Sequence, residues 1–129
     1  MFNLWFALIQ NELYINIMIL KSGEKIHVIH RPRFEKDSHR HFVGVVETYE
    51  NGVARATGYI YVVDRTKLVF VRRPDRRTRL ISVGSGDAWI NILPASVDLE
   101  KVVYRHESDV VRVTDGSEWH LDLTEYAWV

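Results

Sequence analysis

The chemistry most evident in this sequence lies in residues 72–79, where five of the eight residues are arginine. Each guanidinium is a planar fork of N–H donors that matches the oxygens of a phosphate or a carboxylate. Pro74-Asp75 predicts a turn in the middle of this stretch, so we expect the arginines at the tip of a β-hairpin. The predicted anion-binding residues, which include two basic residues from an earlier part of the chain, are Arg72, Arg73, Arg76, Arg77, Arg79, Arg31 and Arg33.

These arginines favour a non-enzymatic binding module that engages an anionic partner. A nucleic acid, a phosphorylated ligand and an acidic protein surface all present the required charge. Aromatic side chains that can stack on bases are expected nearby, and they are Phe42, Tyr59, Tyr61 and Phe70. A structural interpretation competes with this one: the charged tip is solvated, pairs with the acidic C-terminal part of the chain, and protects a sheet edge from association.

A second group of residues has the chemistry to bind a divalent metal. His39 and His41 are two apart at the start of a predicted strand, so their side chains can point the same way. Glu47 follows on the same strand, and imidazole together with carboxylate suits a divalent ion. His39, His41 and Glu47 are therefore the candidate metal ligands, with simple solvation of a polar loop as the alternative. His27 and His30 are three apart, which places them on opposite faces of a strand.

The same residues carry a resemblance to a known family. His39-x-His41 followed by Glu47, with Gly86-Asp87 leading to Ile92-Leu93-Pro94, resembles the metal-binding motifs of the cupins. The interval between the second histidine and the glutamate is longer than in the cupin pattern. Ala95-Ser96-Val97 also stands where that pattern has a glycine and a histidine. The resemblance implies a metal-dependent enzyme with a divalent ion as cofactor, as an alternative to a binding module without a cofactor.

Turn signals divide the chain into the short elements that must position these residues. They are Ser22-Gly23, Asn51-Gly52, Pro74-Asp75, Gly84-Ser85-Gly86 and Asp115-Gly116. This spacing predicts one all-β domain over residues 1–129, an antiparallel barrel or sandwich of about eight to ten strands connected by hairpins. Residues 1–11 are predicted to be a short helix or a non-native extension, with Met18 as an alternative start.

The first predicted hairpin uses Ser22-Gly23 to join residues 12–20 to residues 25–31. In this register Ile19 lies opposite Ile26, and Lys21 lies opposite Glu24.

Asn51-Gly52 is the strongest hairpin signal, and it joins residues 42–49 to residues 53–63 with Glu50 opposite Val53. One face then collects Val43, Val45, Glu47, Tyr49, Ala54, Ala56, Ile60 and Val62. The other face holds Phe42, Val46, Thr48, Arg55, Thr57, Tyr59 and Tyr61. Both faces are largely apolar, so both are expected to be covered. A Glu47 carboxylate on such a face would need an arginine partner or a proton.

Two further expectations concern the later strands. Pro74-Asp75 is predicted to reverse the chain, so that residues 42–93 form a five-stranded antiparallel meander. Near the C-terminus, a three-residue loop at residues 115–117 places Val113 opposite Trp119 and Val111 opposite Leu121. This register keeps the polar side chains at positions 112, 120 and 122 in water.

Composition limits the class of protein. The 129 residues are 47% hydrophobic and include no cysteine, which favours a single folded, cytoplasmic domain without disulfides or thiolate metal sites. The net charge is zero, yet residues 21–83 carry 14 Lys/Arg against 7 Asp/Glu, and residues 84–129 carry 3 against 9. No uninterrupted apolar span of membrane length is present. Apolar residues on both strand faces and the bipolar charge also suit a homo-oligomer, which is a further alternative function.

Overall fold

The computed structural model describes residues 19–31, 39–64, 66, 69–107 and 109–123. The expectations for residues 1–18 and for Arg33 lie outside these ranges. Within them the chain is nearly all β-strand, with no helix of seven or more residues, which confirms the all-β prediction. No helix in the described part of the chain is long and apolar enough to cross a membrane.

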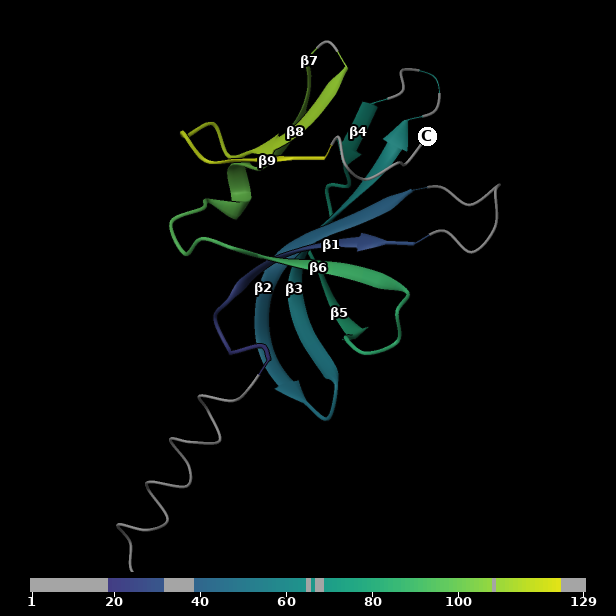
Figure 1. Cartoon of the computed structure of the whole chain (residues 1–129), viewed down its shortest axis with the longest axis vertical. Coiled ribbons are helices and arrows are strands. Elements are labelled where there is room, and N and C mark those ends of the chain that lie inside the picture. The colour runs from purple at the N-terminus through teal and green to yellow at the C-terminus, as the bar shows by residue number, and fades with distance from the viewer. Residues whose placement is uncertain (1–18, 32–38, 65, 67–68, 108, 124–129) are drawn as a thin grey trace, which may run out of the picture.

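The strands form two antiparallel sheets (Figure 1). In chain order the elements are β1 (Lys25–His30), β2 (Arg40–Glu50), β3 (Val53–Asp64), β4 (Val69–Arg72), β5 (Arg77–Ser82), β6 (Ala88–Leu93), the 3-10 turn η1 (Leu99–Lys101), β7 (Val103–Glu107), β8 (Val110–Thr114) and β9 (His120–Asp122). The larger sheet has the order β4-β3-β2-β1-β6, with β5 also paired to β3, and the smaller sheet has the order β7-β8-β9. The larger sheet is not closed into a barrel.

Both faces of the larger sheet are buried, as expected from its apolar strands. One core lies inside the curl of this sheet and includes Ile81 of β5, and its buried residues are Leu20, Ile26, Val28, Phe42, Val46, Ala54, Ala56, Ile60 and Ile81. The other face packs against η1 and the smaller sheet, which lies beside β4 in Figure 1. That second core contains Val43, Tyr61, Phe70, Leu93, Val97, Val102, Val111, Val113 and Leu123.

The β2–β3 hairpin confirms the predicted turn and corrects part of the predicted faces. Asn51 and Gly52 both have positive φ, 49° and 80°, and Glu50 pairs with Val53. Val46 pairs with Ala56, however, and the pairing is displaced at the next position, because Glu47 is an extra residue in β2.

This β-bulge explains which of the predicted faces were wrong. A one-residue insertion moves every side chain before it to the opposite face of the strand. Phe42 and Val46 therefore join Tyr49 and the residues of β3 in the first core, whereas Val43 joins Tyr61 in the second. The expectation that Glu47 lies on an apolar face is also wrong, because its side chain is exposed.

Two facing glycines allow β2 and β3 to bend sharply against each other. Gly44 pairs with Gly58. A Cβ atom on Gly58 would overlap the carbonyl oxygen of Val43, and one on Gly44 would lie 2.6 Å from the carbonyl oxygen of Thr57. Only glycine fits this approach of the two backbones, so the curl of the sheet depends on this pair.

The predicted meander is wrong at Pro74-Asp75. β4 and β5 do not pair with each other; both pair with the same edge of β3, and they run in the same direction. The last pair of β4 is Arg72 with Tyr61, and the first pair of β5 is Arg77 with Gly58. Four residues, 73–76, separate these two pairs on the edge segment, whereas only two residues separate them on β3. The segment is thus one interrupted edge strand with a two-residue bulge, and not a hairpin tip.

Two other pairings differ from expectation. The turn at Ser22-Gly23 is present, since the Glu24 amide donates to the Lys21 carbonyl (3.1 Å), but Ile26 pairs with Gly44 on one side and Ile92 on the other. The predicted pairing of Ile19 with Ile26 is therefore wrong, because β2 and β6 occupy both edges of β1.

The C-terminal hairpin is displaced by two residues from its predicted register. Val113 pairs with Leu121, and the Leu123 amide donates to the Val111 carbonyl (2.9 Å). A displacement of two residues keeps every side chain on its predicted face, because side chains alternate between the faces of a strand. The cause is a longer loop, in which the Asp115 carboxylate accepts bonds from the amide and hydroxyl of Ser117 and from the Asp98 amide.

Candidate functional site

The arginine-rich segment lies along the outer edge of β3, and every residue from 71 to 80 is exposed. Two of its arginines are used within the molecule. The Arg72 guanidinium lies 4.6 Å from the centre of the Tyr59 ring and donates to the Glu100 carbonyl (2.8 Å), and Arg76 lies 3.8 Å from the Glu100 carboxylate. This part of the segment matches the structural interpretation, in which the basic stretch meets acidic residues of the C-terminal part.

The remaining arginines of the segment face solvent. Arg73 uses its backbone amide to bind the Ile60 carbonyl (2.8 Å), and its side chain is exposed. On β5, Arg77 and Arg79 lie opposite Gly58 and Ala56 of β3, and both side chains are exposed. Neither forms an ion pair with any residue that the structure describes. Arg31, at the end of β1, is also exposed, and its amide donates to the Asp87 carbonyl (2.8 Å).

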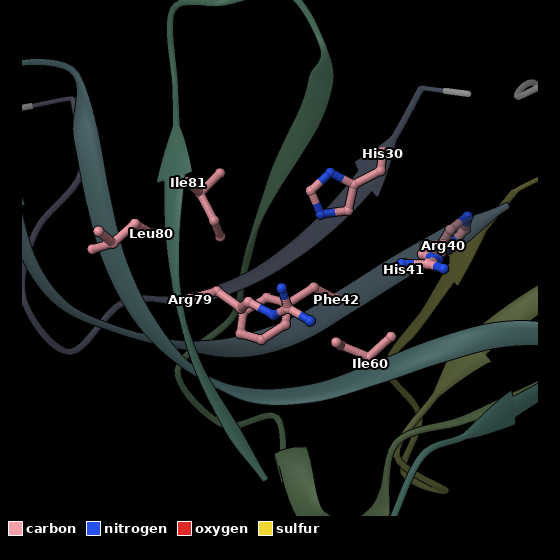
Figure 2. Close-up of a pocket in the computed structure, with 8 residues that line it drawn as sticks. All are labelled: His30, Arg40, His41, Phe42, Ile60, Arg79, Leu80 and Ile81. Carbon is pink, nitrogen blue, oxygen red and sulfur yellow. The ribbon is translucent and has the colours of Figure 1, made fainter. Parts of the chain in front are cut away.

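A pocket of about 200 Å³ opens beside Arg79, between β1, β2, β3 and β5 (Figure 2). Its floor consists of apolar side chains from the first core, Phe42, Ile60 and Ile81. The rim carries His30, Arg40 and Arg79, and Figure 2 shows His30 and Arg79 facing the same space from different strands. The remaining lining residues are His41 and Leu80.

The rim is electrostatically uncompensated. Partial burial lowers the pKa of His30, and the neighbouring charges of Arg79 and Arg40 lower it further. Within the described ranges, no carboxylate lies within ion-pair distance of either of these two arginines. Arg40 and Arg79, from two strands, therefore lie beside a His30 that is neutral at pH 7, and an anion bound there would compensate the charge of the two arginines.

The candidate metal ligands do not come together. Glu47 lies six residues beyond His41, about 20 Å along an extended strand. Its carboxylate accepts bonds from Arg55 (2.9 Å) and from the Thr57 hydroxyl (2.6 Å), which lower its pKa. His39 is half-buried just before β2. No group of three His, Cys, Asp or Glu residues suited to a metal occurs in the described part of the chain, so these residues do not fit the ion that the cupin resemblance implies.

His41 instead belongs to a buried polar cluster between the two sheets, made of His27, His41, Tyr104 and Asn91. His27 and His41 are buried, at 0% and 2% exposed. His27 Nε2 lies 3.1 Å from His41 Nδ1 and 2.9 Å from the Tyr104 hydroxyl, which lies 2.7 Å from His41 Nδ1. Asn91 Nδ2 lies 3.2 Å from His27 Nδ1.

One arrangement of protons links Asn91, His27, Tyr104 and His41 in a chain of hydrogen bonds. The Asn91 amide donates to His27 Nδ1, so the His27 proton lies on Nε2 and is donated to the Tyr104 oxygen. The Tyr104 hydroxyl then donates to His41 Nδ1. Burial lowers the pKa of His27 to about 4, and burial together with the neighbouring histidines lowers that of His41 to about 2. Burial also raises the pKa of Tyr104 well above its ordinary value. All three rings are therefore neutral at pH 7, and they join β1, β2 and β6 to β7.

The sequence predicted the direction of one side chain of this cluster but not the cluster itself. Alternation along β1 placed His27 opposite in direction to His30, and the structure agrees, with one buried and the other exposed. Nothing in the sequence pattern related His27 to Tyr104, because they are 77 residues apart and lie in different sheets. Arg40 and His30 were likewise missed as rim residues, since only the register of β1 with β2 brings them to one end of the sheet.

Comparisons with protein-family models, with curated proteins and with solved structures gave no significant match. We therefore infer the function from the geometry of the candidate site.

Proposed function

We propose that the protein is a non-enzymatic binding module that engages an anionic partner at the pocket between β1, β2, β3 and β5. The binding surface consists of the rim residues His30, Arg40 and Arg79 together with the neighbouring Arg31 and Arg77. The observation that carries the proposal is that two arginines, Arg40 and Arg79, line one pocket together with the imidazole of His30, without a described carboxylate to neutralise them.

The charge distribution supports this assignment. Residues 21–83 hold 14 Lys/Arg and 7 Asp/Glu, and they include every residue of the proposed surface. Arg72 and Arg76 contribute less than the sequence suggested, because they contact Glu100. Anions that bind such a surface release counterions, so the affinity must fall steeply as the salt concentration rises.

The experiment measures binding of the full chain to a fluorescent single-stranded oligonucleotide as a generic polyanion, at 50 and 200 mM salt. We expect binding that weakens with salt, and a loss of at least about tenfold in the double variant R40Q/R79Q. Arg105→Gln is the matched control, because Arg105 is exposed on β7 in the other sheet. Absence of binding at both salt concentrations, or an equal loss in R105Q and R40Q/R79Q, would contradict the proposal.

A second candidate function is that of a homo-oligomer subunit. Large apolar side chains are exposed on both outer edges of the larger sheet, Leu80 at 73% on β5 and Trp89 at 59% and Ile92 at 54% on β6. Unpaired strand edges with apolar side chains are templates for association with another chain. Light scattering over a range of concentrations tests this candidate, and a monomer at the highest concentration would exclude it.

A further inference from the structure

We infer that the pocket between β1, β2, β3 and β5 binds a small aryl anion, a single phosphate or carboxylate group carried on a body the size of one benzene ring. This inference rests on the proposed function, because it assigns a ligand class to the same cationic surface. It adds that the apolar floor contributes to binding, so that a simple inorganic anion is a poorer ligand.

The size of the pocket limits the ligand. An apolar cavity of about 150 Å³ is sufficient for benzene, so about 200 Å³ accommodates one ring and a short link to the anionic group. A larger body, such as a two-ring base joined to a sugar, would exceed this volume.

The chemistry of the lining separates into two parts. Phe42, Ile60 and Ile81 are 1%, 9% and 4% exposed, so the floor is continuous with the first core and offers apolar contact. Hydrogen-bond donors from three different strands surround the opening, and they belong to His30, Arg40 and Arg79. A ligand with an apolar end and an anionic end satisfies both parts, whereas a neutral aromatic leaves the rim uncompensated.

The geometry also favours one anionic group over an extended polyanion at this position. Arg40 and Arg79 lie on β2 and β5, which are separated by β3, and both line the pocket. A single phosphate or carboxylate offers several oxygens to guanidinium donors at one opening. Exposed arginines along a strand would follow a polymer backbone instead.

The test compares three probes by calorimetry on the full chain: phenyl phosphate, inorganic phosphate and phenol. We expect phenyl phosphate to bind at least about tenfold more tightly than inorganic phosphate, the factor expected for removing one ring face from water. Phenol should bind more weakly than phenyl phosphate by a similar factor. Nuclear magnetic resonance shifts on adding phenyl phosphate should be largest at residues 30, 40, 79 and 81.

Two variants separate the parts of the site. Ile81→Phe fills the floor, so it should abolish the preference for phenyl phosphate and leave the affinity for inorganic phosphate unchanged. Arg79→Gln lies on the exposed rim and should weaken both phosphates about tenfold, with Arg105→Gln as the control for loss of one positive charge. If I81F does not fold, the probe ratio in the native chain still decides the question.

The possible failures are distinguishable. Equal affinities for phenyl phosphate and inorganic phosphate, with oligonucleotide binding intact, would overturn the aryl pocket and leave the anionic partner of the proposed function. Phenol binding as tightly as phenyl phosphate would also overturn the pocket as an anion site. If no phosphate and no oligonucleotide binds, the proposed function itself is wrong.

Discussion

Acid should destabilise this fold through its two buried histidines. His27 and His41 are neutral in the folded state because burial lowers the pKa of His27 to about 4 and that of His41 to about 2. In the unfolded chain both side chains return to the ordinary value of 6.5. Below pH 6.5 the unfolded state therefore binds protons that the folded state does not, and the free energy of unfolding must fall as the pH falls.

The size of the loss follows from the two pKa values. Each histidine lowers the free energy of unfolding by about 1.4 kcal/mol per pH unit between 6.5 and its folded pKa. At pH 5 this amounts to about 2 kcal/mol for each histidine, or about 4 kcal/mol for the pair, against a typical domain stability of about 5–15 kcal/mol. The loss of unfolding free energy at pH 5 has this size as long as the folded-state pKa values of both histidines lie well below 5. Carboxylates contribute little in this range, because their ordinary pKa values lie near 4.

The assay is urea unfolding at pH 7 and pH 5, with the difference in unfolding free energy as the readout. The variants are H27Q, whose amide nitrogen replaces Nε2 as donor, and H41N, whose amide oxygen replaces Nδ1 as acceptor. All chains also carry His30→Gln, since the pKa of His30 is lowered too. Each variant should reduce the loss between pH 7 and pH 5 by about 2 kcal/mol. His120→Gln, on exposed β9, is the control and should leave the loss unchanged.

The reasoning would be refuted if the background protein kept its full stability at pH 5. It would also be refuted if H27Q and H41N lost as much stability between the two pH values as H120Q.

Three other predictions concern stability. Tyr104→Phe removes the hydroxyl between His27 and His41, whose Nε2 and Nδ1 atoms lie 3.1 Å apart and can still pair with each other, so the free energy of unfolding should fall by only about 0.5–1.5 kcal/mol at pH 7. Tyr49→Phe, for which the structure gives no hydroxyl partner among the described residues, is a nearly neutral control. Gly58→Ala forces a Cβ onto the Val43 carbonyl oxygen and should destabilise the fold by about 3 kcal/mol or more, whereas Gly84→Ala enters open space; equal effects of the two in thermal unfolding would contradict the glycine-pair argument. Glu47→Ala breaks an exposed ion pair with Arg55 and an exposed hydrogen bond from Thr57, so the unfolding midpoint should change by less than about 2 °C, and a large decrease would indicate that the carboxylate is buried after all.

The class of fold was predictable because it depends on local rules. Asn51-Gly52 specifies a two-residue hairpin whichever strands flank it, and alternation of apolar residues indicates burial on both faces. The extra residue at Glu47 was not predictable in the same way. No composition marks a β-bulge when the inserted residue is an ordinary polar side chain, and one unnoticed insertion exchanges the faces of all residues before it.

The failure at Pro74-Asp75 has a different cause. This dipeptide favours a bend, and a bend is present, but whether it reverses the chain depends on which edge is free to pair. β3 has 12 residues, long enough to pair with β4 and β5 one after the other. This error also affected the prediction of the candidate site. Arg79 is exposed, as a residue of the predicted basic surface should be, but its neighbours at the pocket come from β1 and β2, which the predicted meander did not place beside it.

One strand, β2, links the two functional features of this molecule and allows them to be separated. Alternation directs Arg40 and Phe42 towards the pocket and His41 towards Tyr104, so neighbouring residues serve opposite faces. If the pocket binds anions through its rim and the cluster only joins the sheets, H27Q, at a cluster residue that does not line the pocket, should change the acid sensitivity and leave the affinity for phenyl phosphate at pH 7 within about twofold. Arg79→Gln should do the reverse, weakening phenyl phosphate about tenfold without altering the loss of stability between pH 7 and pH 5. A variant that moved both quantities together would show that the pocket and the cluster are energetically coupled, and that the separate roles assigned to them are wrong.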